Sequence, residues 1–207
     1  MYLGFDEQFD QKLLLDGSAG TDDIEGLDHL VATDPTTGTV GGIDRSVAGN
    51  SWWRNNFSLG LTTTTTTGTI IDKMEIEWRN CIKNGGRPNF IMVGSDFYDG
   101  YRNFLLKTYG QVNYSAGDQM SIEGGTEVVR FKGVPMVWNP TFDDLGGTWA
   151  KRCYFINTRF MQMKEIQGKI SRKPPRPYDR YEHYFGMTWR GALAMTRANA
   201  HAVLTVA

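Results

Sequence analysis

Apolar residues recur at helical spacing most clearly between residues 71 and 83. One face of this segment carries five apolar side chains: Ile71, Met74, Trp78, Cys81 and Ile82. Thr69 lies just before this segment and Asp72 lies in its first turn, with the spacing of a capping box. Two glycines follow the segment at 85–86, where a left-handed residue commonly ends a helix. The pattern predicts an amphipathic helix over residues 71–83.

Short apolar runs bounded by turn-forming residues indicate strands around this helix. The clearest run, 88–93, leads through Ser95, a predicted helix N-cap, into a second amphipathic helix over 96–109. Residues 160–170 alternate in part, as in a strand exposed on one side, and 184–197 is extended. Further predictions are strands at 127–131, 134–138, 153–156 and 200–207, loops at 111–125 and 143–147, and an opening helix at 2–15. This order indicates an α+β fold with a central sheet flanked by helices.

The stretch of residues 34–56 breaks this regularity. It has almost no helical or strand periodicity and concentrates turn formers, a Gly-Gly pair and two adjacent indoles, so we interpret it as a junction. Trp52, Trp53 and Arg54 are candidates for a domain junction or a subunit edge, because two indoles in a loop form a large apolar surface. The sequence leaves open whether they hold their own domain or a neighbouring subunit.

The composition is that of a folded chain with a sizeable core. Its 207 residues are 40% hydrophobic and 13% aromatic, enough for one domain or two closely joined subdomains. The net charge of -1 lacks the basic excess of a dedicated nucleic-acid-binding protein, so any contact with nucleic acid is expected to be local. Cys81 and Cys153 lie far apart in apolar surroundings, which predicts buried, reduced thiols. The sequence shows neither a membrane-spanning run nor a signal peptide.

Residue types that carry catalysis or bind metals are scattered along the chain. His29, His183 and His201 lack the paired spacing of zinc ligands. Ser95 lies in a Gly-Ser-Asp sequence without the second glycine of a nucleophile elbow, and the phosphate-loop pattern does not occur. We therefore predict no catalytic residue, no cofactor, no metal site and no enzymatic activity.

Basic residues gather around the Pro-rich segment 171–180. Five cations lie there or just before it: Lys169, Arg172, Lys173, Arg176 and Arg180. The prolines exclude this segment from the interior of a sheet. Its cations are candidates for contact with phosphates or with acidic residues of a neighbouring subunit, and a solvated loop is the structural alternative. Because the chain as a whole is neutral, we favour subunit contact over nucleic acid.

Several motifs in sequence order carry a resemblance to a known family. They are the opening helix ending in Leu14-Leu15-Asp16-Gly17, the Ile24-Glu25-Gly26-Leu27 piece, the GTVGGIDR and SWWRN motifs within residues 38–55, the helix–strand–helix unit over 71–109, and Phe131-Lys132-Gly133-Val134-Pro135-Met136-Val137. Together they resemble the major capsid proteins of tailed phages and prophages with the HK97-type fold. The resemblance covers essentially the whole chain, and its specificity lies in the joint order of individually weak motifs.

The resemblance implies a role for each part of the chain. Residues 1–45 and 163–191 look like the remnant of a peripheral domain, with the end of a spine helix and long antiparallel strands, and residues 46–162 and 192–207 look like an axial domain. It implies a structural protein that self-assembles through pentamers and hexamers into an icosahedral shell around DNA. The implied partners are other copies of the chain, a scaffolding protein and packaged DNA on the shell interior, without a membrane. The implied location is the virion capsid, after synthesis in the bacterial host cytoplasm.

The front of the chain departs from the pattern of that family. The N-terminal arm, the extended E-loop and most of the spine helix have no counterpart, so residues before Met1 are expected to be missing. The complete protein is expected to form closed shells, and this fragment is expected to stay small. Two alternatives remain: an encapsulin-like shell that packages protein cargo, and an unrecognised hydrolase, since a fold alone does not fix a function.

Overall fold

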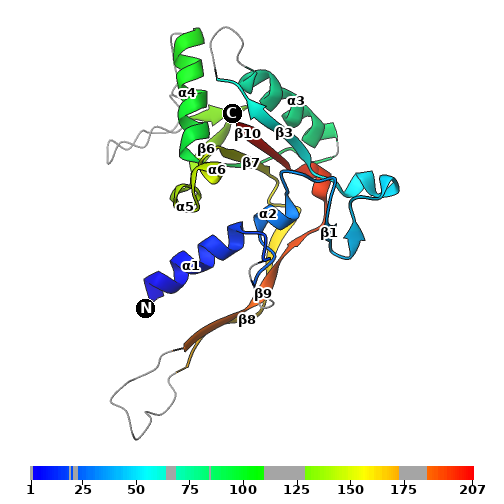
Figure 1. Cartoon of the computed structure of the whole chain (residues 1–207), viewed down its shortest axis with the longest axis vertical. Coiled ribbons are helices and arrows are strands. Elements are labelled where there is room, and N and C mark those ends of the chain that lie inside the picture. Colours follow the sequence, from blue (N-terminus) through cyan, green and yellow to red (C-terminus); the bar gives the residue numbers. More distant parts are fainter. Residues whose placement is uncertain are drawn as a thin grey trace, which may run out of the picture.

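A six-stranded mixed sheet forms the body of the molecule, and a two-stranded ribbon projects from one end of it (Figure 1). The computed structural model describes residues 2–18, 20, 23–63, 69–83, 85–109, 129–172 and 186–207. The sheet has the strand order β3-β10-β7-β4-β6-β5, and the ribbon consists of β8 and β9. The last strand of the chain therefore lies inside the sheet, between β3 and β7.

The sheet combines parallel and antiparallel pairs. Its strands are β3 (Asn56–Leu61), β4 (Phe90–Val93), β5 (Arg130–Phe131), β6 (Val134–Trp138), β7 (Arg152–Ile156) and β10 (Ala202–Val206). β3 runs parallel to β10 and β4 runs parallel to β6, whereas β7 is antiparallel to both of its neighbours. Every residue of β7 is buried, because layers of side chains cover this strand on both faces.

Helices α3 (Ile70–Lys83) and α4 (Ser95–Tyr109) cover one face of the sheet (Figure 1). The apolar stripe of α3 faces inward, and the Trp78 ring meets Phe131 and Phe155 edge-on, with centroids 5.6 and 5.7 Å away. Phe131 and Phe155 stack on each other at 5.8 Å. Gly85 has a φ of 89° and donates its N–H to the Ile82 carbonyl, which ends α3 in the left-handed turn that glycine favours.

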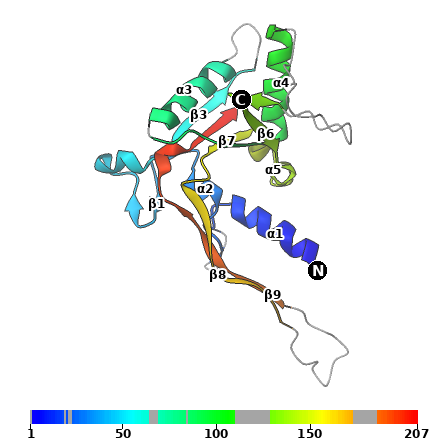
Figure 2. The ribbon, with the colours of Figure 1, turned by 180° about the vertical axis from the view of Figure 1, so that it is seen from behind.

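A second layer of helices covers the opposite face of the sheet (Figure 2). It consists of α1 (Tyr2–Leu14), α2 (Leu27–Leu30), α5 (Pro140–Asp144) and α6 (Gly147–Ala150). Phe142 of α5 meets Tyr154 of β7 edge-on at 5.8 Å and lies 5.5 Å from Trp149 of α6. The two layers give the sheet one hydrophobic core on each face.

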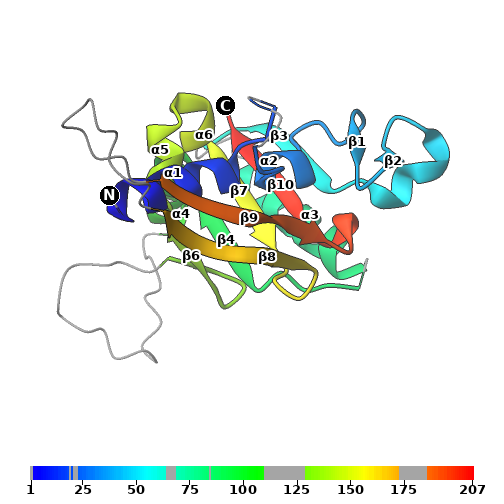
Figure 3. The same ribbon diagram turned by 90° about the horizontal axis from the view of Figure 1, so that it is seen from below.

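Strands β8 (Met161–Arg172) and β9 (Gly186–Met195) pair antiparallel to form the ribbon. The register shifts between Glu165 and Gln167 and again before Ile170, irregularities of the kind that increase the twist of a two-stranded ribbon. Helix α1 runs alongside the ribbon (Figure 3). Near the body, the ribbon packs Met161, Leu193 and Met195 against the second core.

A short hairpin and a 3-10 helix fill the stretch between α2 and β3. The hairpin pairs β1 (Thr39–Val40) with β2 (Ile43–Asp44), and the 3-10 helix η1 spans Ala48–Trp53. A second 3-10 helix, η2 (Ala198–Ala200), precedes β10 and packs against η1. Figure 3 shows the hairpin and η1 projecting from one side of the body.

The expected α+β fold, with a central sheet flanked by helices, is confirmed. The predicted helices correspond to α1, α3 and α4, and the strands predicted at 88–93, 134–138, 153–156 and 200–207 correspond to β4, β6, β7 and β10. The partly alternating segment 160–170 corresponds to β8, and the extended segment 184–197 corresponds to β9. The loop predicted at 111–125 and the first two residues of the strand predicted at 127–131 lie outside the described residues.

Two predictions of local structure are wrong, and one stretch has more structure than its pattern indicates. Residues 34–56, interpreted as a junction, contain the β1–β2 hairpin and η1. Residues 143–147, expected as a loop, hold the end of α5 and the start of α6. Asn139 makes this possible by accepting a hydrogen bond from the Thr141 N–H at the start of α5. Ser95 is the first residue of α4, and Asp143 of α5 accepts its N–H at 3.2 Å in place of a local cap.

Candidate functional site

Trp53 and Arg54 brace the β1–β2 hairpin from the inside. The Trp53 indole Nε1 donates a hydrogen bond of 2.9 Å to the Val40 carbonyl. The Arg54 guanidinium donates to the Arg45 carbonyl at 2.8 and 2.6 Å and to the Ser46 carbonyl at 3.4 Å. Both side chains are half-buried, so they position the hairpin.

Arg45 joins the same hairpin to α2. Its side chain is 1% exposed, and its guanidinium donates to the Leu30 carbonyl at 2.5 Å and to the His29 carbonyl at 3.3 Å. Burial lowers the pKa of Arg45 below its ordinary value, but a guanidinium starts from a pKa so high that it stays charged. A cation at the carboxyl end of α2 satisfies carbonyls that have no partner inside the helix.

Two aspartates set the turns on either side of the hairpin. Asp34 Oδ1 accepts from the Thr36 N–H and hydroxyl, and Asp44 Oδ1 accepts from the Ser46 N–H. The hydroxyl and N–H donors of Thr36 and Ser46 lower the pKa of both carboxyl groups below the ordinary value. The Asp-x-Ser/Thr spacing and the Gly-Gly pair at the hairpin tip are signals from which this hairpin could have been predicted.

Trp52 points away from these braces. Its side chain is 55% exposed, and its ring centroid lies 5.5 Å from that of Trp53 with an angle of 58° between the rings. Both indoles line a cavity of about 380 Å³ together with Thr196, Arg197 and Asn199. The structure thus separates the three candidate residues of this loop: two face the hairpin, and Trp52 faces solvent.

The basic candidates of the ribbon are only partly described. Arg172 is exposed at the end of β8. Lys169 lies within β8, but its side chain is outside the described part of the structure, as are Lys173, Arg176 and Arg180. The described end of β8 lies at the tip of the ribbon, far from the hairpin and η1, so Arg172 and Trp52 belong to separate surfaces (Figure 1).

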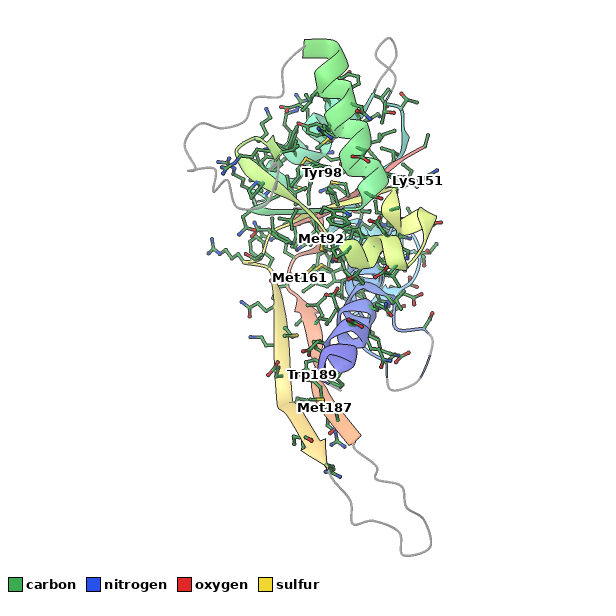
Figure 4. All side chains as sticks on the ribbon, turned by 90° about the vertical axis from the view of Figure 1, so that its left-hand side faces the viewer. Met92, Tyr98, Lys151, Met161, Met187 and Trp189 are labelled. Carbon is green, nitrogen blue, oxygen red and sulfur yellow. The ribbon has the colours of Figure 1, made fainter. Side chains whose placement is uncertain are left out.

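A groove of about 680 Å³ lies between α1 and the ribbon. Phe9 of α1 meets the Trp189 ring of β9 edge-on at 4.8 Å, and Trp189 Nε1 donates to Glu165 Oε1 at 3.2 Å across the ribbon. Figure 4 shows Trp189 beside α1. A Cβ atom at Gly191 would lie 2.5 Å from the Trp189 ring, so the ring position requires a glycine there. The contact could not be predicted from the sequence, because nothing local links Phe9 to Trp189.

A buried polar network joins α2 to the sheet. The Arg152 guanidinium pairs with Asp28 Oδ1 at 2.8 Å, donates to the Tyr154 hydroxyl at 3.0 Å and lies 4.0 Å from the centroid of the Trp149 ring. Burial raises the pKa of Tyr154, and the nearby Asp28 carboxylate adds to this effect. The phenol therefore stays neutral, and the network holds one cation against one carboxylate.

Exposed apolar side chains lie on the edge strand β3, at the end of β6 and on the ribbon. Phe57 and Leu59 are 42% and 50% exposed on the edge strand β3, and Trp138 is 51% exposed at the end of β6. Ile166 in β8 is 89% exposed. Exposed apolar groups of this size are typical of surfaces that contact another molecule. The alternation of Phe57 and Leu59 with polar residues was the available sequence signal for β3.

The structure separates Ser95 from His201, two residues that a hydrolase could use, and His183 lies outside the described residues. The Ser95 hydroxyl donates to Asp143 at 2.7 Å at the start of α4, after the end of β4. His201 precedes β10, and its Nδ1 accepts from the Asn157 N–H at 3.3 Å. Because β4 and β10 are both antiparallel to β7, Ser95 and His201 lie at opposite ends of the sheet.

Further chemistry is limited in the part of the chain that the structure describes. Cys81 and Cys153 are buried free thiols, as predicted, and burial raises the pKa of Cys81 to about 12. Within the described ranges, no group of three or more His, Cys, Asp or Glu side chains is arranged to hold a metal ion. Among the described helices, none is both long and apolar enough to cross a lipid bilayer.

The body, its two helical layers and the projecting ribbon place the chain in the class of phage capsid folds. One solved structure to which it is similar is the cyanophage A-1(L) capsid asymmetric unit, with a TM-score of 0.61 and 16% sequence identity. The alignment covers 97% of this chain and 65% of that capsid chain, so the chain spans about two-thirds of its length. No family model and no curated protein matches the sequence. The likeness supports the HK97-type fold that the motif order implies.

Proposed function

We propose that the chain is a structural subunit of a tailed-phage or prophage capsid that self-assembles into an icosahedral shell around DNA. The observation that carries this proposal is the capsid fold, which extends over 97% of the chain. The separation of Ser95 from His201 argues against the hydrolase alternative. The proposed role is non-enzymatic and requires no cofactor.

The proposed division of labour follows the two parts of the fold. Residues 46–162 and 192–207 would form the axial domain, which corresponds to the body, and residues 1–45 and 163–191 would form the peripheral part with α1 and most of the ribbon. The core on the α3–α4 face lies wholly within the proposed axial residues, which supports this division. The core on the opposite face also includes Leu14, Leu27, Leu30, Val31 and Val40, so it attaches the proposed peripheral part to the body. The pairing of β8 with β9 supports a common assignment for both strands.

The proposed subunit contacts lie where large side chains face solvent. Trp52 is the strongest candidate, because buried Trp and Arg residues supply much of the energy of protein interfaces. Trp53 and Arg54 contribute by positioning it. On the ribbon, the proposed contacts are Lys169, Arg172, Lys173, Arg176 and Arg180.

The proposed partners are other copies of the chain, in pentamers and hexamers, a scaffolding protein during assembly, and DNA on the inner surface. The proposed location is the virion capsid, after synthesis in the host cytoplasm. An encapsulin-like shell with protein cargo is the alternative within the same fold, and the same experiment separates the two roles.

Negative-stain electron microscopy of the protein produced from its complete gene tests the proposal. Closed shells that contain nucleic acid are the expected result, and Trp52→Ser is expected to reduce their yield. Ile76→Ser is the control, because Ile76 is also exposed, at 38%, but lies on α3 and is not among the proposed contacts. Shells filled with an enzyme would favour the encapsulin-like role, and protein that stays monomeric would contradict both.

A further inference from the structure

Three connections meet at the end of the sheet from which the ribbon leaves. They are residues 85–89 before β4, 157–160 after β7, and 196–200 before β10. Asn157 Nδ2 donates to the Arg87 carbonyl at 3.0 Å, and the Thr196 N–H donates to the Phe160 carbonyl at 2.9 Å. These bonds join the three connections into one surface.

This surface carries a cluster of exposed cations, which we call the basic rim: Lys83, Arg87, Arg159 and Arg197. The Arg197 guanidinium lies 4.9 Å from the centroid of the Phe160 ring, and the Arg159 guanidinium lies 5.8 Å from the same centroid. A Cβ atom at Gly85 would lie 2.4 Å from an Arg197 nitrogen, so the end of α3 lies directly beside Arg197. The Phe160 ring thus lies beside two of these guanidinium groups, those of Arg159 and Arg197. The Arg87 guanidinium donates to the Lys132 carbonyl at 2.9 Å.

The chain segments that build the basic rim contain no carboxylate. Residues 78–94, 157–164 and 192–207 include no Asp or Glu, although the whole chain has 23 of them and a net charge of -1. The nearest acid on α3, Glu77, is 6% exposed and accepts hydrogen bonds from Ser58 and Asn80. The basic rim is therefore a concentrated positive surface on a neutral protein.

The polar groups of this surface suit a phosphate backbone better than a protein partner. Asn89 and Thr158 exchange two hydrogen bonds, of 2.7 and 2.9 Å, and add amide and hydroxyl groups beside the arginines. The centre of a protein–protein interface is rich in apolar residues and poor in charged ones. A nucleic-acid interface, by contrast, is polar and strongly positive. Arginine, amide and hydroxyl side chains supply most contacts to DNA phosphates.

We propose that the basic rim binds the phosphate backbone of nucleic acid without reading its sequence. This rests on the proposed function, because in a capsid it makes the basic rim part of the surface that faces packaged DNA. It goes further by naming the contact residues. The overall neutrality of the chain fits a local contact of this kind.

Fluorescence anisotropy of a labelled DNA duplex, titrated with the protein at several salt concentrations, tests the inference. Binding should weaken with salt, and Arg159→Gln with Arg197→Gln should reduce the slope of log K against log salt by about 1.8, or about 0.9 per cation removed. The paired Arg159→Lys and Arg197→Lys variant should keep the original slope, because it keeps both charges. Thermal melting confirms that each variant is folded.

The matched control removes two exposed cations away from the basic rim, with Lys73→Gln on α3 and Arg190→Gln on β9. This variant has the same net charge as the basic-rim variant, so its slope should stay near that of the unmodified protein. An unchanged slope in the basic-rim variant, or an equal loss in the control, would overturn the inference.

Shell formation is scored separately by electron microscopy. Loss of shells with an unchanged slope would mean that the basic rim binds an acidic surface of another subunit, and would overturn the inference while leaving the capsid role intact. A reduced slope in a variant that still forms shells supports it. If the unmodified protein forms no shells, the capsid role fails, and the slope still decides whether the basic rim binds DNA.

Discussion

The central strand of the body and the strands of the ribbon differ in how they are supported. All of β7 is buried, with Phe155 fully buried on one face of the sheet and Tyr154 fully buried on the other. In β9 exposed residues alternate with half-buried ones, and the neighbouring β8 carries Ile166 with 89% of its surface exposed. The body thus supplies its own core on both faces, whereas the ribbon is covered only in part by α1.

This difference predicts different consequences of mutation in the two regions. Residues of the body are constrained by packing, since close-packed cores respond to the loss of even one methylene group. Apolar residues exposed on the ribbon do not contribute to such a core, so under the proposed capsid role they are available for contact with another subunit. Changes in the body should therefore affect stability, and changes at the exposed positions of the ribbon should affect assembly.

The largest effect is expected for Phe155→Ala. Phe155 is fully buried, stacks on Phe131 and meets Trp78 edge-on, so the change leaves a cavity and should lower the free energy of unfolding by about 3–5 kcal/mol. Urea denaturation measures it. Met163→Ala in the ribbon, where the side chain is 45% exposed, is the comparison and should cost less than about 1 kcal/mol. Similar losses at both sites would contradict the contrast between body and ribbon.

The next effect concerns pH and His201. Burial lowers the pKa of His201 from 6.5 to about 4, so between these values the unfolded chain binds a proton that the folded chain does not. Stability from this residue is complete above pH 6.5 and falls as the pH drops towards 4, by about 3 kcal/mol in total. Urea denaturation over this range should show the fall, and His201→Gln should flatten it. An unchanged pH dependence in the variant would exclude His201 as its source.

A smaller loss is expected for Asp28→Ala, which tests how firmly α2 is attached to the body. The change leaves Arg152 without its carboxylate partner and should cost about 1–3 kcal/mol in the free energy of unfolding. Glu25→Ala is the matched control, because Glu25 is 66% exposed and lies 3.6 Å from His29; it should change stability by less than about 0.5 kcal/mol. Equal effects would mean that the buried network does not join α2 to the sheet.

The smallest change in stability is expected for Ile166→Ser. The side chain is almost entirely exposed, so the free energy of unfolding should shift by no more than about 0.5 kcal/mol. If the ribbon contacts another subunit, the yield of shells should nevertheless fall, as measured by sedimentation. Full assembly of the variant would argue against a contact at this position.

The sequence was most informative where one element has a regular pattern of its own. The spacing of Met74, Trp78 and Cys81 was sufficient to predict α3, and the uninterrupted apolar run of β7 was sufficient to predict a buried strand. Short elements were missed, because two-residue strands and four-residue helices have no periodicity to detect. β3 was missed because its alternation is brief and ends at Gly60.

Groups built from distant parts of the chain could not be predicted from the sequence. Asp28 and Arg152, or Phe9 and Trp189, meet only because the sheet and the ribbon bring separate elements together. The sequence singles out Trp52 and Trp53 together, because two indoles lie side by side in a loop. Only the hydrogen bond from Trp53 to the Val40 carbonyl shows that Trp52 is the indole that faces solvent. Local patterns therefore gave the elements, and the sites depend on how those elements pair.

Hydrogen exchange of assembled particles, compared with dissociated protein, tests the central claim most directly. If the chain is a capsid subunit, amides of β8, β9 and the η1 segment should exchange more slowly in the particles, because neighbouring subunits cover them. Amides of β7 and β10 should exchange equally slowly in both states, since the body protects them already. Failure to form particles, or unchanged exchange in β8, β9 and η1, would contradict the claim.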